Sequence, residues 1–375
     1  MCKYLMQKLD FQPRKKVINY YLEPTQKIQE GWQMTYKQQG LPRWRGFNLL
    51  GLYTSKHDGA FPLEDFDLIS ELGFDFVRIP MSYRKWTCAG DLDASMADKV
   101  YQIDEAALEQ LDGCVEHALQ RGLHVNLNLH RAPGYCINPG EKEPFDLWKD
   151  QAAVDAFAWH WELLAKRYKG LSAKQLSFDL VNEPPGPQKI TREEHRRAIA
   201  AAVQAIRRVS PDRLIVADGM DAGNLPCPEL QDLHIAQSCR AYIPSGITHF
   251  RAQWVDRKRN FPEAKWPGGF AGQLEGLWDR ERLERHYGMW AAMAENFHMG
   301  VHCGEGGCFN QTPYDVTLRW MEDLLDVLKQ FNIGYALWNF KGGFGILDSE
   351  RKGAQYVDFH GHQLDKKMLD LMKKY

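Results

Sequence analysis

Residues 175–186 have the sequence QLSFDLVNEPPG, and this stretch decides the fold. Residues 176–181 form a short and mostly apolar run, which is typical of a buried strand. Asn182 and Glu183 follow directly, and the two prolines after them prevent the strand from continuing. A buried strand that ends in an amide and a carboxylate indicates that the end of this strand carries chemistry.

Similar runs recur along the chain and alternate with amphipathic stretches. Eight runs resemble strands: 43–52, 74–81, 123–130, 175–183, 213–219, 233–242, 301–307 and 333–340. Helix-like stretches have apolar residues at three- and four-residue spacing: 62–72, 103–121, 150–168, 192–209, 283–299 and 315–331. Strands that alternate with helices pair in parallel, and eight strands fit a closed (β/α)8 TIM barrel. We therefore predict a single α/β barrel domain over residues 1–375.

The main alternative is an open, doubly wound sheet. That fold would place a glycine-rich phosphate-binding turn after its first strand. Residues 46–59, GFNLLGLYTSKHDG, lack the G-x-G-x-x-G pattern, and no helix-like stretch directly follows GGFG at 342–345. The barrel is therefore favoured.

Two segments extend a minimal barrel. Residues 1–42 precede the first strand and form a predicted N-terminal extension. Residues 243–282 follow the sixth strand and are rich in Trp, Gly, Pro and charged residues. A connection of this length usually has a function, so we predict a lid or a binding loop.

The composition excludes several classes of partner. Lys and Arg total 47 against 49 Asp and Glu, so no basic face is expected for nucleic acid. No run of 18 apolar residues predicts a membrane span. The eight cysteines show no regular spacing, and the first residues lack the apolar segment of a signal peptide. We expect a cytoplasmic protein, or a secreted one if a signal peptide has been removed.

In a barrel of this kind the active site lies at the carboxyl ends of the strands. The predicted strand ends carry Arg78, Asn128, His130, Asn182, Glu183, Arg240, Tyr242, His302, Glu305, Trp338 and Asn339. Two carboxylates surrounded by Arg, His, Asn, Tyr and Trp suit the hydrolysis of a glycosidic bond.

The chemistry assigns different states to the two carboxyl groups. One must be protonated to donate to the leaving oxygen, and the other must be ionised to attack the sugar carbon. At about 5–5.5 Å the two repel each other as anions, which separates their pKa values. A nearby Arg and a Tyr hydroxyl would keep one of them ionised. This mechanism needs no metal and no organic cofactor.

Five segments are informative together: FVRIP at 76–80, NLHRAPG at 128–134, LVNEP at 180–184, HCGEGG at 302–307 and ALWNFKGGFGILDSERK at 336–352. They resemble glycoside hydrolase family 5, the cellulase-type family of clan A retaining β-glycosidases, over about residues 43–352. The resemblance implies Glu183 as the general acid/base and Glu305 as the nucleophile. It also implies further roles: Asn182 on the sugar 2-hydroxyl, Arg78 and Tyr242 supporting the nucleophile, His130 in the −1 subsite and Trp338 as its floor.

One position departs from the family. The family usually has His-x-Tyr at the end of strand six, followed by a Pro and a Thr-His pair. Residues 240–250 here are RAYIPSGITHF, so Arg240 replaces the His while Tyr242 and His249 remain. Arg is longer and always charged. It either reshapes the −1 subsite, binds an anionic group of the substrate, or turns outward to pair with a carboxylate.

Other conspicuous residues have plainer interpretations. His302, Cys303 and Cys308 lack a second pair of ligands, so we predict buried thiols and no zinc site. Four tryptophans lie in loops of the predicted active face, where some of them line outer sugar sites and others pack: Trp86, Trp148, Trp254 and Trp266.

We therefore predict a retaining hydrolase of β-linked glucans or their oligosaccharides. Two alternatives remain open. The first is an exo-acting β-glycosidase or transglycosidase on small or substituted glycosides, which closure of the groove by residues 243–282 would favour. The second is a carbohydrate-binding barrel without catalysis, in which Arg240 marks the loss of activity.

Overall fold

The computed structural model describes residues 41–54, 61–87, 94–138, 140, 142–255, 261, 263–268 and 277–375. Contacts group the chain into two units, Met1–Thr35 and Tyr36–Tyr375, and the described residues belong to the second. The predicted extension 1–42 therefore lies outside the described residues, except for its last two positions. Residues 256–260, 262 and 269–276 of the predicted insertion also lie outside them.

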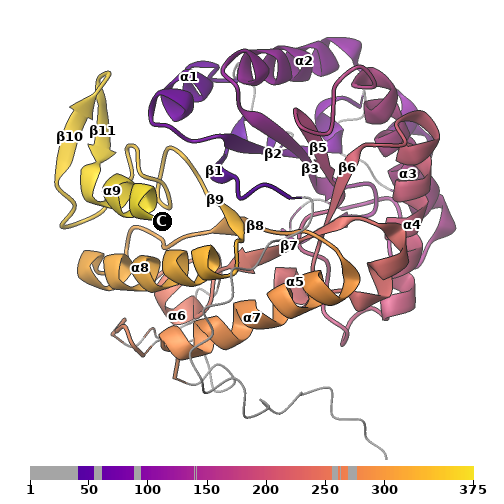
Figure 1. Ribbon diagram of the computed structural model, residues 1–375. Helices are drawn as coiled ribbons and strands as arrows, with labels where there is room; N and C mark the ends of the chain where they lie inside the picture. Colours follow the sequence, from indigo (N-terminus) through magenta and orange to yellow (C-terminus); the bar gives the residue numbers. More distant parts are fainter. Residues whose placement is uncertain are drawn as a thin grey trace, which may run out of the picture. The chain divides into compact units, whose positions relative to one another are not determined.

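Eight parallel strands close into a barrel, which confirms the predicted fold (Figure 1). In order around the barrel they are β1 (Arg45–Asn48), β2 (Phe76–Ser82), β3 (His124–Ala132), β5 (Leu176–Asp179), β6 (Leu214–Asp218), β7 (Ala236–Ala241), β8 (Val301–Gly306) and β9 (Gly334–Leu337). The barrel closes because β9 pairs with β1, as Phe47 lies opposite Leu337. A short strand β4 (Tyr135–Cys136) pairs back onto β3.

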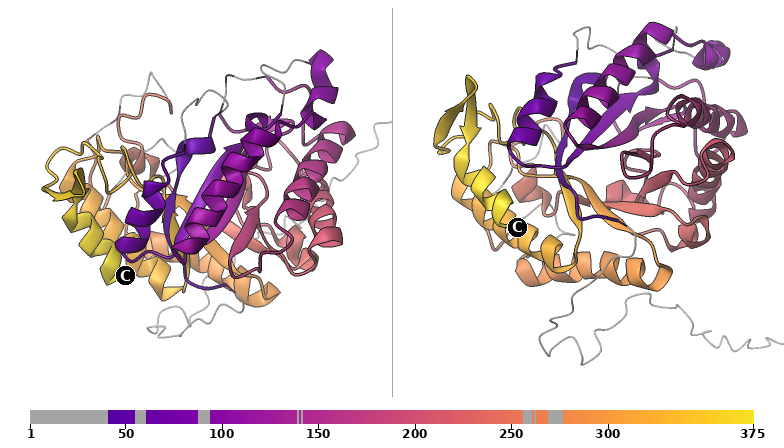
Figure 2. Two further views of the ribbon diagram at one scale, coloured as in Figure 1. Left: turned by 90° about the horizontal axis from the view of Figure 1, so that it is seen from above. Right: turned by 45° about the horizontal axis from the view of Figure 1, so that its top comes forward.

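Helices surround the strands (Figure 2). They are α1 (Glu64–Glu71), α2 (Glu105–Gln120), α3 (Gln151–Arg167), α4 (Arg192–Val209), α7 (Arg280–Phe297), α8 (Tyr314–Gln330) and α9 (Lys366–Lys374). The six predicted helices are all present. Their starts follow local chemistry: a capping box between Thr191 and Glu194 begins α4, and the Asp104 side chain accepts the Ala106 N–H at the start of α2.

Two connections depart from a regular strand–helix repeat. Between β6 and β7 the chain, described throughout, contains only α5 (Met220–Gly223) and a 3-10 helix (Pro228–Leu233). The prolines and glycine of this segment disfavour a longer helix. After β7 comes a short α6 (Ser245–Thr248), and after β9 a hairpin of β10 (Tyr356–Phe359) and β11 (His362–Asp365) precedes α9.

Strand β3 shows how the sheet separates polar and apolar side chains. All nine of its residues are buried. Leu127 and Leu129 belong to the hydrophobic core, whereas Asn126 lines a small cavity inside the barrel. Asn126 donates to Ser177 Oγ (2.8 Å), and Asn128 donates to the Asp179 carbonyl (3.1 Å). The barrel interior thus contains hydrogen-bonded polar side chains beside apolar ones such as Trp44 and Phe76.

No helix in the described part of the chain has the length and apolar character that crossing a membrane requires.

Candidate active site

Glu183 lies just beyond β5, in a turn fixed by its neighbours. Its φ is 49°, in the left-handed region, which for a residue other than glycine requires support from surrounding contacts. Its backbone N–H donates to Asp218 Oδ2 (2.8 Å), and its carbonyl accepts from the Tyr135 hydroxyl (2.6 Å). The side chain is 15% exposed. The turn therefore presents the Glu183 carboxyl at the mouth of the barrel.

Glu305 lies within β8 and is buried, with only 4% of its side chain exposed. Glycines flank it, and Gly304 is required for space. A Cβ at Gly304 would lie 2.5 Å from Ser238 Oγ and 3.0 Å from Arg240 Nη1. The absence of a side chain on Gly304 thus leaves room inside the barrel for buried guanidinium groups beside Glu305.

Arg78 on β2 is the first of these groups. Its Nη1 donates to Glu305 Oε1 (2.6 Å) and to Asn48 Oδ1 (3.0 Å). Its Nε donates to Asp179 Oδ2 (2.8 Å), and its Nη2 donates to Asn182 Oδ1 (3.0 Å). Arg78 therefore fixes the Glu305 carboxylate on one side.

Arg240 on β7 lies on the other side and is equally buried. Its two terminal nitrogens donate to the two oxygens of Asp218, with Nη1 3.0 Å from Oδ1. Nη2 also contacts Asn182 Oδ1 (2.9 Å) and Glu305 Oε1 (3.4 Å). Nε lies 3.4 Å from Glu183 Oε1. Of the positions considered for Arg240, the outward one is therefore wrong: the side chain pairs with a carboxylate inside the barrel.

Asn182 and Tyr242 complete this network. Asn182 Oδ1 accepts from both guanidinium groups, which turns its Nδ2 toward Glu183 Oε2, at 3.4 Å. The Tyr242 hydroxyl donates to Glu305 Oε2 (3.2 Å). Each oxygen of the Glu305 carboxylate thus has a donor.

His130 and Trp338 form a separate aromatic wall with Tyr53. The ring of Tyr53 lies 4.5 Å from that of His130 and 5.4 Å from that of Trp338, and the His130 and Trp338 rings are 5.7 Å apart. His130 Nε2 bonds to Asn138 Oδ1 (2.6 Å). Burial lowers the pKa of His130 to about 4, so the ring is neutral near pH 7.

His249 lies beside Tyr242 and Thr248. Its ring packs 5.0 Å from that of Tyr242, and its Nδ1 lies 2.9 Å from Thr248 Oγ1. Beyond it lies Trp254, at 6.4 Å between rings. The His249 ring therefore packs against the Tyr242 ring and also contacts the exposed Trp254.

The two carboxyl groups have opposite pKa shifts. Burial, followed by the negative charge of Glu305, raises the pKa of Glu183 to about 8. Burial acts on Glu305 in the same direction, but the charges of Arg240 and Arg78 outweigh it and hold the pKa of Glu305 below its usual value. Near neutral pH, Glu183 is thus mainly protonated while Glu305 is ionised, as an acid and a nucleophile require.

Several residues of the site were not predicted from the sequence. They are Asn48, Tyr53, Tyr135, Asn138, Asp179 and Asp218. Asp218 could have been found, because it lies next to the end of the predicted strand 213–219, much as Glu183 ends its own. Conversely, His302 is only the second residue of β8 and lines the interior cavity with Trp44 and Phe76, away from the carboxyl end of the strand.

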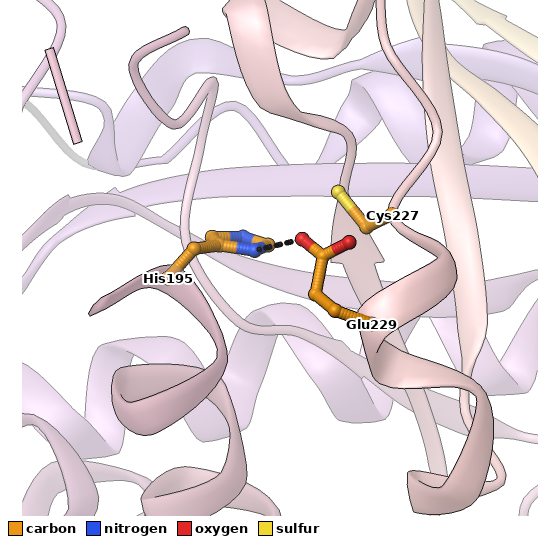
Figure 3. A group of neighbouring side chains, drawn as sticks. All are labelled: His195, Cys227 and Glu229. Atoms are coloured by element: carbon orange, nitrogen blue, oxygen red, sulfur yellow. Dashed lines mark hydrogen bonds and ion pairs between the residues drawn. The ribbon is translucent and has the colours of Figure 1, made fainter. Parts of the chain in front are cut away.

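Within the described ranges, three side chains group at a spacing compatible with a metal ion: His195, Cys227 and Glu229 (Figure 3). Two of them, His195 and Glu229, already form hydrogen bonds. His195 Nδ1 bonds to Glu229 Oε1 (3.1 Å), and Glu229 Oε2 accepts from Arg192 (2.6 Å). Burial raises the pKa of the Cys227 thiol well above its usual value, which opposes the thiolate that a metal needs. The trio is better described as a buried hydrogen-bonded cluster.

A parallel barrel with one carboxyl group after its fourth strand and a second in its seventh, linked through a buried guanidinium, is typical of a class, the two-carboxylate glycosidases. Comparison with known proteins places the chain within that class. The family model Cellulase (glycosyl hydrolase family 5) matches residues 37–343, so the chain belongs to this family. It is a retaining glycoside hydrolase.

Individual relatives agree with the family. The chain is 27% identical over 337 residues to "Endoglucanase C" of Acetivibrio thermocellus, which covers 82% of this chain and 94% of the relative. It is 24% identical over 308 residues to "Probable glucan 1,3-beta-glucosidase A" of Aspergillus clavatus, covering 76% and 71%. A solved structure described as a glycoside hydrolase has 41% identity and a TM-score of 0.82, and covers 88% of this chain and 99% of that one.

Proposed function

We propose that the protein hydrolyses β-glucosidic bonds of glucan oligosaccharides, with Glu305 as the nucleophile and Glu183 as the general acid/base. One observation carries the assignment: Glu305 contacts two guanidinium groups and a tyrosine hydroxyl, whereas the partly exposed Glu183 carboxyl has only long contacts, at 3.4 Å, to Arg240 and Asn182. The better neutralised carboxylate is the one that remains ionised, and the other retains the proton.

In the first step Glu305 attacks the anomeric carbon while Glu183 donates its proton to the departing oxygen. The glycosidic C–O bond breaks and an ester bond to Glu305 forms. Formation of the ester removes the negative charge of Glu305, which otherwise raises the pKa of Glu183. The pKa of Glu183 therefore falls at the point where this residue must act as a base.

In the second step Glu183 takes a proton from water, and the oxygen of that water attacks the same carbon. The ester bond breaks, Glu305 leaves as a carboxylate, and the sugar is released with its original anomeric configuration. The Asn182 amide, whose Oδ1 is held by both guanidinium groups, is oriented to hydrogen-bond the sugar 2-hydroxyl through Nδ2. His130 and Trp338, with Tyr53, provide the wall of the −1 subsite.

The substrate is expected to be neutral. Arg240 is the cation nearest to Glu183, but Asp218 binds both of its terminal nitrogens, so it has little capacity for an anionic group of a sugar. This arrangement favours a reshaped −1 subsite over recognition of an acidic substrate.

The aromatic residues indicate an oligosaccharide. Of the four loop tryptophans, Trp86, Trp148 and Trp266 are buried, whereas Trp254 is 60% exposed. Its ring packs 4.7 Å from that of Phe309 and 6.3 Å from that of Phe344. The two phenyl rings pack against the Trp254 indole at steep angles. A flat face of this exposed indole is therefore available to stack on a second pyranose ring.

The location of the protein is a further proposal. Five cysteines in the described part of the chain are buried free thiols: Cys114, Cys227, Cys239, Cys303 and Cys308. Free thiols fit a reducing compartment. We propose that the enzyme acts in the cytoplasm on short oligosaccharides, which fractionation of cells with an antibody to the protein would test.

A substrate panel tests the proposed function. The purified protein is incubated with β-1,3-, β-1,4- and mixed-linkage gluco-oligosaccharides, with mannan oligosaccharides and with aryl β-glucosides, and the products are resolved over time. We expect turnover of at least one β-gluco-oligosaccharide. Products of intermediate length would indicate endo-action, stepwise release of short units would indicate exo-action, and products longer than the substrate would indicate transfer.

Substitution of the nucleophile accompanies this panel. Glu305→Ala should lower kcat by roughly 10⁴-fold or more, since it removes the covalent intermediate. Glu281→Gln is the control, because this residue is 77% exposed on α7. Undiminished turnover in Glu305→Ala would refute the nucleophile, and the absence of turnover by the wild type on every substrate would refute the function.

A further inference from the structure

Asp218 ends β6 and is completely buried, and it is a third carboxylate beside the pair Glu183 and Glu305. Its two carboxylate oxygens accept hydrogen bonds from different donors. Oδ1 accepts from Arg240 Nη1 (3.0 Å), while Oδ2 accepts both from Arg240 Nη2 and from the backbone N–H of Glu183 (2.8 Å). One carboxylate thus binds the backbone of the proposed acid/base and the side chain that lies between the two catalytic carboxyl groups.

The Arg240 side chain has little freedom to move from this position. Ser238 Oγ accepts from its Nη1 (2.8 Å), and Asn182 Oδ1 accepts from its Nη2 (2.9 Å). Gly223, in the loop that follows Asp218, packs against its aliphatic part: a Cβ there would lie 2.4 Å from Arg240 Cγ. The β6 strand end and its loop therefore hold the guanidinium from two sides.

The loop after Asp218 is shaped for this contact. Asp221, Ala222 and Gly223 all have φ between 54° and 79°. Two of these residues are not glycine, so the conformation persists only where neighbouring contacts impose it. The Ala222 N–H donates to the Pro184 carbonyl (3.0 Å), which ties the loop to the residue directly after Glu183.

Arg240 Nε is the one donor of this guanidinium that remains without a hydrogen bond. It lies 3.4 Å from Glu183 Oε1, while Nη2 lies 3.4 Å from Glu305 Oε1. A small movement of the two side chains toward each other would allow the Arg240 Nε–H to donate to the Glu183 carboxylate once that residue loses its proton. The orientation of Arg240 therefore determines how much positive charge each catalytic carboxyl group experiences.

On the basis of the proposed function, we propose that Asp218 is a positioning residue that sets the proton balance of the catalytic pair by fixing Arg240 between Glu183 and Glu305. It touches no substrate. Its effect passes through the guanidinium that it orients and through the Glu183 backbone that it binds.

The charged groups around Glu183 determine the direction in which a change at Asp218 or Arg240 should shift the pKa of Glu183. The charged groups that act on it come from four strands: Glu305 on β8, Arg240 on β7, Asp218 on β6 and Arg78 on β2. The hydroxyl groups of Tyr53, Tyr135 and Tyr242 also lie near it and are un-ionised at neutral pH. Asp218 raises the pKa of Glu183, whereas Arg240 lowers it and has the larger effect of the two.

The test is the pH dependence of kcat/KM in Asp218→Asn, Arg240→Gln and the double variant, on the best oligosaccharide of the panel. The alkaline limb of this profile reports the proton on Glu183. It should move to lower pH in Asp218→Asn and to higher pH in Arg240→Gln, each by about one unit or less. The alkaline limb of the double variant should lie between that of the wild type and that of Arg240→Gln.

The double variant also guards against misfolding, because it leaves no unpaired charge and keeps two amides of similar shape. Asp218→Glu, which retains the charge, should restore the wild-type limb more fully than Asp218→Asn does. We expect kcat/KM at the optimum to fall roughly 10- to 100-fold in Asp218→Asn. A merely structural role would lower the amount of folded enzyme without moving the alkaline limbs in opposite directions.

An alkaline limb in Asp218→Asn that stays in place or moves upward would overturn the proposal, and so would equal displacement of the limb in both single variants. This failure is distinct from failure of the proposed function. The latter would appear as a wild type without turnover on the panel, whereas the former requires a wild type that hydrolyses.

Discussion

Two buried Arg–Asp pairs flank the nucleophile, and they differ in what else they touch. Arg78 with Asp179 lies on the side of β2 and β5, and Arg240 with Asp218 lies on the side of β6 and β7. Both arginines donate to Asn182 Oδ1 and to Glu305 Oε1. Only Arg240 also faces Glu183, and only Asp218 binds the Glu183 backbone.

The difference separates two tasks. The contact of Arg78 with Glu305 is short, at 2.6 Å, and its aspartate retains an oxygen without a hydrogen bond, Asp179 Oδ1. That pair acts mainly on the nucleophile, although Arg78 Nη2 also lies 3.9 Å from Asp218 Oδ2. The contacts of Arg240 with the two catalytic carboxyl groups are equal, at 3.4 Å. That pair links the protonation of one carboxyl group to that of the other.

Removal of Arg78 should give the largest effect of the comparison. Arg78→Gln deletes the shortest ion pair of Glu305, so we expect kcat/KM to fall about 10²- to 10³-fold. Arg78 lowers the pKa of Glu305, so its loss raises that pKa and moves the acidic limb of the profile to higher pH. The alkaline limb should move less, because Arg78 has a smaller effect on Glu183 than Arg240 has.

A pH profile of Arg78→Gln beside Arg240→Gln measures this difference directly. Circular dichroism and the thermal midpoint establish that both variants fold. Arg78→Lys is a useful companion, since an ammonium group cannot reproduce the fork that Arg78 uses to reach several acceptors. Equal displacement of both limbs in Arg78→Gln would show that the two Arg–Asp pairs act alike on Glu183 and Glu305, and would contradict the proposed difference between them.

Much of this arrangement could be predicted from strand position alone. Arg78, Asn182, Glu183, Tyr242 and Glu305 meet because parallel strands bring their carboxyl ends to one face of the barrel. The local sequence is sufficient for that step, since apolar runs and their polar ends are short-range features.

The pairing of the two arginines could not be predicted in the same way. Whether Arg240 turns inward depends on Asp218, which lies 22 residues earlier, and on the space left by Gly304 in another strand. Tyr53 and Asn138 lie in loops, where neither periodicity nor strand position indicates a direction. Such contacts are decided by the packing of distant segments.

The next prediction concerns Asp179. Burial and the charge of Asp218 raise the pKa of Asp179 to about 7, even though Arg78 opposes the shift. In the unfolded chain the pKa of an Asp is about 3.9. The folded state therefore binds more protons between these values, and the contribution of Asp179 to stability is present below pH 4 and lost as pH rises through about 7.

Asp179→Asn should consequently flatten the dependence of stability on pH. Its thermal midpoint should change less between pH 5 and pH 8 than that of the wild type, although it is lower at pH 5 because Arg78 loses a partner. Asp218→Asn is the matched comparison, since it also leaves a buried arginine without its aspartate. A wild-type midpoint that rises from pH 5 to pH 8 by more than that of Asp179→Asn would contradict the raised pKa.

The smallest effect is expected far from either pair, at Trp254. The Tyr242 and Trp254 rings lie 5.0 and 6.4 Å from the His249 ring, so their centres are at most 11.4 Å apart. That span suits a sugar one or two units from the bond that is cleaved. Loss of one stacking contact should therefore weaken binding of long substrates and leave the chemistry of Glu183 and Glu305 unchanged.

Trp254→Ala should raise KM for an oligosaccharide about 3- to 10-fold with little change in kcat, and should leave hydrolysis of an aryl β-glucoside unaffected. Val357→Ala, 45% exposed on the β10 hairpin, is the control for loss of an exposed apolar side chain. An equal loss on both substrates would place Trp254 within the catalytic network, and no change on either would remove it from the sugar path. A displaced pH limb is not expected, since Trp254 carries no charge and is not among the groups that shift the pKa of Glu183 or Glu305.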